Sequence, residues 1–356
     1  MRIALLNLPF DNNYGGNLQR YALSKVLQSL GHDITYLFVK FDVKNPPFYF
    51  QVYKSFTYLL RSVVGKRNWD WKSVVTPSLL YKQKCKLANT FIDRYLCRTE
   101  PIYDVKDLSK YVDFDVFLVG SDQVWRKTIA KNYLPTMFFD YLPDKIKRVA
   151  YSVSLGSDKN ELTEEEIVFL GRLYSKFSAV SVREQSALDL FRLYHWKSPY
   201  AVCTLDPTLL LDRQDYIDLV EAADTFPSDG NMFCYILDPS KEKKEYIEII
   251  KNKNKLKPYY FGINTKHSLS IEQWLRSFLD AQFVVTDSFH GFVFSIVFNK
   301  PFYLFRNDFR GNARFESLSN LLGVDLNSVG QDWVHINEMR AKEIEKSIDF
   351  LRKSLK

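Results

Sequence analysis

The sequence is poor in cysteine and histidine, and it lacks the motifs that these residues form in metal sites. The four cysteines are far apart, with no CxxC pair: Cys85, Cys97, Cys203 and Cys234. This spacing argues against a zinc knuckle and a disulfide framework, and it fits a reducing cytoplasm. No HExxH motif is present either, so we expect no metal site and no metal cofactor.

Long apolar runs are also missing. No uncharged apolar run approaches the length of a membrane span. Residues 3–6 are apolar but too short for the core of a signal peptide, and no small-residue cleavage site follows them. We expect a soluble or peripheral cytoplasmic protein. Its 356 residues and 46% hydrophobic content favour two globular domains.

The net charge of +7 is concentrated in one segment. Residues 41–100 hold eleven Lys and Arg against four Asp and Glu, whereas the rest of the chain holds 38 of each sign. Aromatic residues are interleaved with these charges: Phe48, Tyr49, Phe50, Tyr53, Phe56, Tyr58, Trp69 and Trp71. Such a segment is either a solvated helical insertion or a contact with an anionic membrane or nucleic acid. No nucleic-acid-binding module is recognised, and we expect no nucleic-acid partner.

Alternating strand and helix signals predict an α/β fold. Strands are expected at residues 2–8, 34–39, 116–119, 148–153, 179–182, 232–237, 259–261, 283–285 and 301–304, with amphipathic helices between most of them. Thr163 and Glu166 predict a capping box at the start of one helix, and the last helix is expected at about residues 337–351. Pro207 restricts Asp206 to an extended conformation at the end of the first unit. We predict two Rossmann-like domains facing across a cleft. The first, residues 1–211, carries a mainly helical insertion at about 41–105. In the second, residues 212–356, the last helix is expected to pack back on the first domain.

The motif Thr286-Asp287-Ser288-Phe289-His290-Gly291 joins a short apolar strand to the start of a helix. In α/β proteins such a junction attracts anions through free backbone N–H groups and the helix dipole. A neutral imidazole there can accept and donate a proton, so His290 is the candidate general acid/base. The alternative is a histidine that only hydrogen-bonds the backbone.

Arginines follow two of the predicted strands. Arg183 ends one strand, and Arg306, Arg310 and Arg314 follow another. Guanidinium groups bind phosphate and carboxylate in bidentate fashion, so a cluster of them at one sheet edge predicts an anion site. Taken singly, each could equally be a surface arginine.

Two other chemistries have weaker support. Asp113 and Asp115 have Asp-x-Asp spacing, but they precede their strand and favour a solvated turn over a metal site. Ser121, Asp122 and His290 could form a hydrolytic triad, although no GxSxG elbow is present. A glycine-containing loop follows the first strand, but neither GxGxxG nor GxxxxGK(S/T) occurs, so a dinucleotide or P-loop site is not supported.

Seven motifs in order resemble the polysaccharide pyruvyl transferase family. They are Asn13-Tyr14-Gly15-Gly16 with Leu18-Gln19, Gly120-Ser121-Asp122-Gln123-Val124-Trp125, Ser181-Val182-Arg183-Glu184, Asp206-Pro207-Thr208-Leu209-Leu210, Gln273-Trp274-Leu275, Val285 to Gly291, and Asn312-Ala313-Arg314-Phe315. The resemblance covers almost the whole chain and implies a glycosyltransferase-B-like pair of Rossmann-like domains.

The resemblance implies transfer of a pyruvyl group from phosphoenolpyruvate to a sugar of a bacterial surface polysaccharide, forming a pyruvate ketal. The acceptor would be lipid-linked, with peripheral membrane contact through residues 41–100, and no cofactor is implied beyond the donor substrate. His290 matches the catalytic histidine. The implied donor-binding residues are Arg183, Ser288, Gly291, Arg306, Arg310, Asn312 and Arg314. The implied acceptor-binding residues are Asn13, Tyr14, Gly15, Gly16, Gln19, Ser121, Asp122, Gln123 and Trp125.

One position departs from the family pattern. Members characteristically carry an arginine two positions before the histidine, and this chain has Ser288 there. We expect Arg306, Arg310 or Arg314 to replace the missing charge. Two alternative functions remain at this stage: a sugar-nucleotide-dependent glycosyltransferase of the same architecture, and a catalytically idle protein that binds membrane or nucleic acid through its basic segment.

Overall fold

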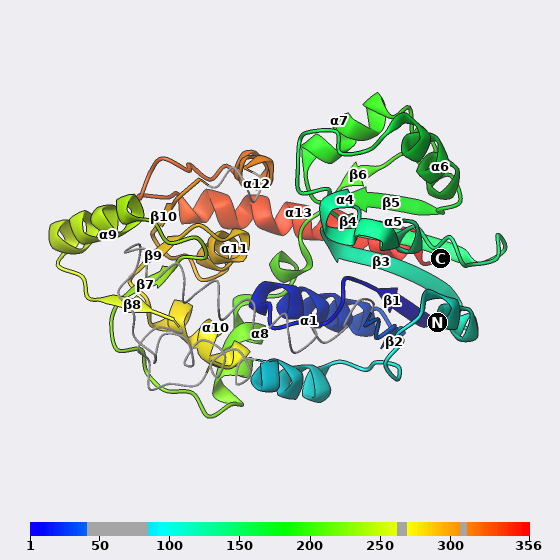
Figure 1. Cartoon of the computed structure of the whole chain (residues 1–356). Coiled ribbons are helices and arrows are strands. Elements are labelled where there is room, and N and C mark those ends of the chain that lie inside the picture. Colours follow the sequence, from blue (N-terminus) through cyan, green and yellow to red (C-terminus); the bar gives the residue numbers. More distant parts are fainter. Residues whose placement is uncertain (41–84, 262–268, 307–311) are drawn as a thin grey trace, which may run out of the picture.

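The computed structural model of the chain describes residues 1–40, 85–261, 269–306 and 312–356. Two lobes are visible, each built around one parallel sheet, and both chain ends lie on the first lobe (Figure 1). The predicted fold class is confirmed. The predicted insertion lies outside the described residues up to residue 84, and its remaining part begins with a helix over residues 85–95.

The first sheet has six parallel strands in the order β2-β1-β3-β4-β5-β6. Their bounds are β1 Arg2–Leu6, β2 Asp33–Tyr36, β3 Val116–Asp122, β4 Lys147–Val153, β5 Ala179–Val182 and β6 Val202–Cys203. The chain leaves β1 toward β2 and returns on the other side at β3. The carboxyl ends of β1 and β3 therefore diverge into a crevice, which is where ligands bind in open α/β sheets.

The strands of this sheet are buried on both faces because their side chains alternate between two cores. Ile3 and Leu5 of β1 join one core, whereas Ala4 and Leu6 join the other. This explains why the strands appear in the sequence as continuous apolar runs rather than as alternating patterns.

The second sheet has four parallel strands in the order β10-β9-β7-β8. Their bounds are β7 Met232–Tyr235, β8 Pro258–Tyr260, β9 Phe283–Thr286 and β10 Phe302–Leu304. The chain reverses direction across the sheet between β7 and β9. A second crevice therefore forms at their carboxyl ends, and His290 lies beside it.

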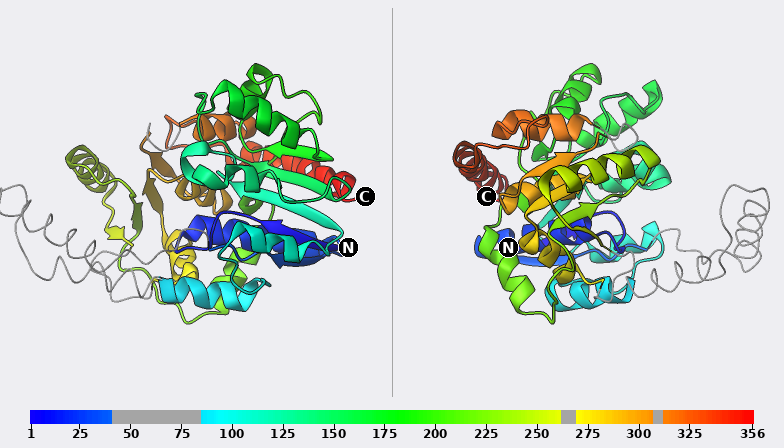
Figure 2. Two further views of the ribbon diagram at one scale, coloured as in Figure 1. Left: turned by 45° about the vertical axis from the view of Figure 1, so that its right-hand side comes forward. Right: turned by 90° about the vertical axis from the view of Figure 1, so that its left-hand side faces the viewer.

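The helices cover the faces of both sheets (Figures 1 and 2). In the first lobe they are α1 Tyr14–Ser29, α4 Lys127–Ala130, α5 Leu134–Met137, α6 Glu164–Tyr174 and α7 Gln185–Leu193, with 3₁₀ turns at Val105–Tyr111, Lys131–Tyr133 and Pro207–Leu209. After the first lobe come α8 Arg213–Glu221, α9 Lys241–Asn254, α10 Ile271–Asp280, α11 Phe289–Val297, α12 Ala313–Leu322 and α13 Trp333–Ser354. The capping box expected at Thr163 and Glu166 is present at the start of α6.

Helix α13 extends from the second lobe to the first (Figure 1). Its Arg340 donates from Nε to the carbonyl of Leu209 at 3.1 Å, and its Ser347 hydroxyl accepts from the Leu205 N–H at 3.0 Å. The chain between the lobes is therefore braced by the last helix.

The two lobes share one core beside the cleft. The largest buried cluster contains residues of α1, α8, α10, α11 and α13 together with one face of each sheet. Within it the ring of Tyr14 stacks on Trp274 with centroids 5.7 Å apart, and the Tyr14 hydroxyl donates to the carbonyl of Leu269 at 2.8 Å. Helix α1 thus covers the first sheet and also packs against the second lobe.

Candidate active site

A cleft of about 770 Å³ lies where the carboxyl ends of the two sheets face each other. Its first-lobe wall follows β1 and β3, and its second-lobe wall follows β7 and β9. The lining residues are Asn12, Asn13, Gly15, Asp122, Gln123, Arg126, Ile129, Tyr235, Leu237, Asp238, Ser288, Phe289, His290 and Arg314. Both crevices that the strand orders create therefore open into one site.

Two helices begin at this cleft, one from each lobe. Asn13 caps α1 by accepting from the Gly16 N–H at 3.3 Å, and Ser288 caps α11 by accepting from the Gly291 N–H at 3.4 Å. The first N–H groups of a helix have no intrahelical partner, and the helix dipole makes this end positive. The cleft is therefore suited to an anion on both walls.

His290 lies in the first turn of α11, directly against the first turn of α1. A Cβ atom on Gly15 would lie 2.1 Å from Nδ1 of His290, so a side chain at position 15 would overlap the imidazole. The other ring nitrogen, Nε2, is buried and makes no hydrogen bond within the described residues. It lies 3.8 Å from Oδ2 of Asp206.

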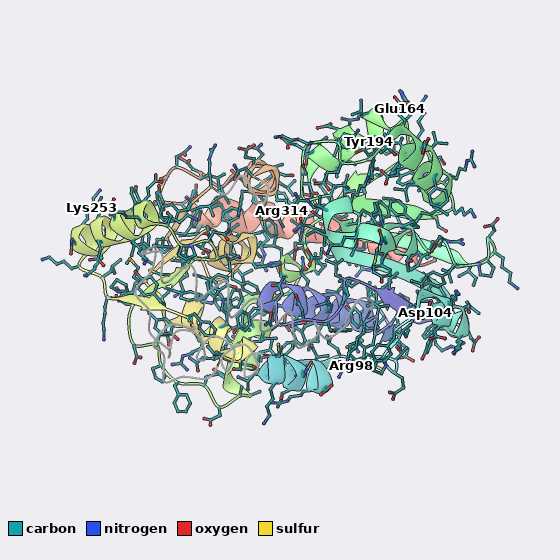
Figure 3. All side chains as sticks on the ribbon, viewed as in Figure 1. Arg98, Asp104, Glu164, Tyr194, Lys253 and Arg314 are labelled. Atoms are coloured by element: carbon teal, nitrogen blue, oxygen red, sulfur yellow. The ribbon has the colours of Figure 1, made fainter. Side chains whose placement is uncertain are left out.

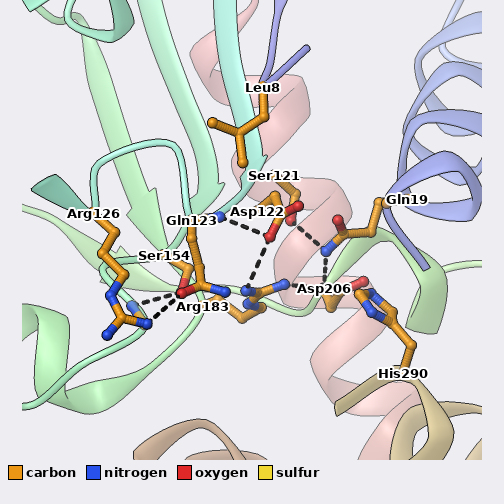
Figure 4. Close-up of polar contacts among 12 residues, drawn as sticks. Leu8, Gln19, Ser121, Asp122, Gln123, Arg126, Ser154, Arg183, Asp206 and His290 are labelled. Atoms are coloured by element: carbon orange, nitrogen blue, oxygen red, sulfur yellow. Dashed lines mark hydrogen bonds and ion pairs between the residues drawn. The ribbon is translucent and has the colours of Figure 1, made fainter. Parts of the chain in front are cut away.

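Asp206 is the centre of a buried polar network between the lobes (Figure 4). Its Oδ2 accepts from Gln19 Nε2 at 2.5 Å and from Arg183 Nη1 at 2.7 Å, and its Oδ1 accepts from the N–H and hydroxyl of Thr208. Ser121 joins the network through Gln19 at 3.3 Å. All four acceptor positions of the carboxylate are therefore occupied.

The electrostatics of this network keep His290 neutral. Burial lowers the pKa of His290 to about 4; the charge of Asp206 opposes this shift, while Arg183 adds to it. Burial alone would raise the pKa of Asp206, but the charge of Arg183 and hydrogen bonds from Thr208 and Arg183 bring it down to about 2. At neutral pH the site thus contains an ionised Asp206, a charged Arg183 and an uncharged imidazole.

Arg183 does not line the cleft. Its side chain is 3% exposed and lies between Asp206 at 2.7 Å and Asp122 at 3.9 Å (Figure 4). Its guanidinium carbon Cζ lies 4.8 Å from the centroid of the Phe289 ring. Cζ of Arg314 lies 5.1 Å from the same centroid. Arg314 does line the cleft, where the two lobes meet (Figure 3).

Seven of the residues predicted from sequence line the cleft: Asn13, Gly15, Asp122, Gln123, Ser288, His290 and Arg314. Gln19, Ser121 and Arg183 are buried behind it in the Asp206 network. Arg310 lies outside the described residues. The role of each residue in binding stays a prediction.

The other predicted residues lie elsewhere. Tyr14 and Gly16 belong to the first turn of α1. Trp125 is buried on Phe138, with ring centroids 4.2 Å apart. Gly291 packs against Thr286, Asn312 precedes α12, and Arg306 is 59% exposed with its Nη1 3.7 Å from Oε1 of Glu316.

Seven lining residues were not predicted from sequence: Asn12, Arg126, Ile129, Tyr235, Leu237, Asp238 and Phe289. Most of them follow β1, β3, β7 or β9, so their position after a predicted strand was the available signal. The structure shows no group of three or more His, Cys, Asp and Glu side chains suited to a metal ion among the residues it describes. In the same ranges, no helix is long and apolar enough to cross a membrane.

The fold and cleft define a class: a glycosyltransferase-B-like pair of Rossmann-like domains. A comparison with solved structures finds UDP-GlcNAc 2-epimerase from Neisseria meningitidis bound to UDP-GlcNAc, with a TM-score of 0.52 and 9% identity over 99% of this chain and 94% of that one. It also finds an alpha-glucosyltransferase in complex with UDP and DNA, with a TM-score of 0.43 and 11% identity over 99% of this chain and 95% of that one. At 9% identity, the likeness to the epimerase concerns the fold alone.

The family follows from the sequence match. The model of the polysaccharide pyruvyl transferase family matches residues 13–309, which is most of the chain. The chain belongs to this family. A comparison with curated protein sequences finds no match.

Proposed function

We propose that the protein transfers a pyruvyl group from phosphoenolpyruvate to a sugar of a bacterial surface polysaccharide and forms a pyruvate ketal. Membership of the family supports pyruvyl transfer. The observation that carries the proposal is the uncharged His290 imidazole in an interdomain cleft whose walls favour anions.

The cleft offers partners for the phosphate and the carboxylate of phosphoenolpyruvate. The first turns of α1 and α11 point positive dipole ends at it, and Arg314 adds a charged guanidinium. Arg183 supports the donor indirectly, because its charge acts from behind the ring of Phe289. No cofactor is required for this assignment.

His290 supplies the proton transfers. Its low pKa keeps the imidazole unprotonated in the unliganded protein. A donor that brings negative charge into the cleft raises this pKa, and the imidazole then takes up a proton. In the complex, His290 gives that proton to the methylene carbon of the donor, which makes C2 electrophilic.

A sugar hydroxyl then attacks C2 and loses its proton to the imidazole. Attack by a second hydroxyl, with departure of the phosphate, closes the ketal. One proton is gained by carbon and two are lost from oxygen, and the phosphate leaves with the remaining proton. A single acid/base residue is therefore sufficient for the sequence of steps.

The acceptor in this proposal is lipid-linked at the inner face of the cytoplasmic membrane. The support is the charge excess of residues 41–100 with its interleaved aromatic residues, a composition suited to anionic lipid headgroups. Peripheral contact through this segment would bring the cleft to the acceptor.

The test is incubation of the purified protein with phosphoenolpyruvate and lipid-linked oligosaccharides, followed by assays for released phosphate and for an acid-labile ketal by NMR. Both products are expected to depend on the acceptor. Stabilisation against heat by UDP, with none by phosphoenolpyruvate, would instead support a sugar-nucleotide-dependent glycosyltransferase and contradict the proposal.

A further inference from the structure

Among the residues that the structure describes, two arginines line the cleft from opposite walls. Arg126 comes from the first lobe, in the loop between β3 and α4, and Arg314 comes from the first turn of α12 in the second lobe. His290 lines the same cleft. Arg183, by contrast, is committed to Asp206 and is withdrawn from the cleft surface.

The side chain of Arg126 is held in place by two acceptors. Its Nε lies 3.0 Å from Oε1 of Glu161. Its Nη1 donates to Oε1 of Gln123 at 2.9 Å (Figure 4). Gln123 occupies the space beside Gly156, where a Cβ would lie 2.1 Å from Oε1 of the glutamine. Glu161 is fixed in turn by the Thr128 N–H at 3.1 Å.

These contacts leave part of the guanidinium fork for a ligand. An arginine has five N–H donors, and the two bonds above use two of them. In the part of the chain that the structure describes, no hydrogen bond engages Nη2 of Arg126. The side chain is 17% exposed, so it is both ordered and accessible.

The two arginines also repel each other. Burial, together with the charges of Arg183 and Arg126, lowers the pKa of Arg314 to about 10, although the carboxylates of Glu184 and Asp122 oppose this shift. Glu161 offsets part of the charge of Arg126, and an anion bound between the two walls would reduce the remaining repulsion. Ser288 is uncharged, so the second-lobe wall lacks the positive charge that an arginine at position 288 would supply.

We propose that Arg126 is a second anion-binding residue of the cleft, which takes the carboxylate of a ligand whose phosphate group lies against Arg314 and the first turn of α11. The inference rests on the proposed function and deepens it. If the donor is phosphoenolpyruvate, its carboxylate and its phosphate are then bound by opposite lobes. The donor then links the two domains, and Arg126 replaces the charge that Ser288 does not provide.

Isothermal titration calorimetry on the full chain tests this inference. The ligands are phosphoenolpyruvate, with two acidic groups, and inorganic phosphate, with one. The variants are R126Q and R126K, and the matched control is R276Q. Arg276 also pairs through Nε with a carboxylate, that of Asp280 at 2.8 Å, but it does not line the cleft.

We expect R126Q to weaken phosphoenolpyruvate binding roughly 10- to 100-fold, with little effect on inorganic phosphate, because one charge-assisted contact is lost. R126K keeps the charge without the fork and should lose less. R276Q should bind both ligands as the unaltered protein does.

Unchanged affinity of R126Q for phosphoenolpyruvate would overturn the inference and leave the proposed function intact. Equal losses for both ligands would also overturn it, since they would indicate a general field effect. If the unaltered protein binds no phosphoenolpyruvate, the proposed function and the inference both fail. Melting curves show whether R126Q is misfolded. If it is, the inference is tested with R126K instead, by comparing its loss of affinity for phosphoenolpyruvate with its loss for inorganic phosphate.

Discussion

Nε2 of His290 lies 3.8 Å from Oδ2 of Asp206, although the two residues belong to different lobes. The carboxylate already receives four hydrogen bonds, so it acts on the imidazole through its charge rather than as a direct partner. This relationship connects the fold, the protonation state of His290 and the four predictions that follow.

Replacing His290 with Asn should remove turnover while leaving donor binding nearly intact. Loss of a general acid/base residue costs roughly 10²- to 10⁴-fold in kcat. The matched control is His195→Asn, because His195 is exposed at the end of α7 with φ of 58°, a conformation that asparagine tolerates. Phosphate release and calorimetry measure the two effects. Retained turnover in the His290 variant would remove this residue from the mechanism.

The stability of the protein should fall in mild acid through His290. Its folded-state pKa of about 4 lies below the ordinary value of 6.5, so the unfolded chain binds the proton more readily. The stabilisation is complete above pH 6.5 and is lost as the pH falls toward 4, by on the order of 3 kcal/mol. Urea unfolding of the native protein and the Asn variant at about pH 7.5 and pH 4.5 measures it. Equal acid losses in both would contradict the pKa assignment.

Substitution of Gly15 by Ala should impair activity without weakening helix α1. Alanine is the better helix former by about 1 kcal/mol, but its Cβ at this position would overlap His290. Gly330→Ala is the control, since its Cβ would lie 3.9 Å from the nearest atom, Oγ of Ser328, and Gly330 does not line the cleft. We expect a large loss of kcat in the first variant and near-normal kcat in the second. Equal activities of the two variants would show that catalysis does not depend on the position that the imidazole has beside Gly15.

Asp206→Asn should destabilise the protein by about 3 to 5 kcal/mol, because it leaves the buried charge of Arg183 without its closest partner. Asp113→Asn is the control, as that carboxylate is 93% exposed and pairs with Arg2 at the surface. Chemical unfolding at neutral pH compares the two. A similar stability for both variants would mean that Asp122 and Glu184 compensate for the lost charge.

The fold was largely predictable because strand and helix signals depend on local sequence. The apolar run of β3, the capping box of α6 and the strand before His290 were each recognised from a few neighbouring residues. Helix α13 is longer than expected, beginning at Trp333 rather than near Asn337. Its first turn is capped by Asp332, a signal that the apolar periodicity does not include.

The site was predictable only in part, because its contacts join distant segments. Asp206 was interpreted as the end of an extended stretch before Pro207, yet its partners are Gln19, Arg183 and Thr208. Arg183 was expected to face the ligand, and its burial depends on carboxylates far away in sequence. Arg126 was missed because a lone arginine after a motif resembles any surface arginine until Glu161 and Gln123 are seen to hold it.

The stacking of Tyr14 on Trp274 bears on the kinetics of binding. Swinging the lobes apart would expose apolar surface that α1 shares with α10; on the order of 200 Å² corresponds to about 5 kcal/mol. A conformation with the lobes far apart is then rarely populated. The donor therefore binds a cleft that is already closed, and its affinity is not reduced by the free energy of closing the lobes. Its association rate should instead depend on ionic strength, since electrostatic attraction between the anion and the positive walls guides the encounter.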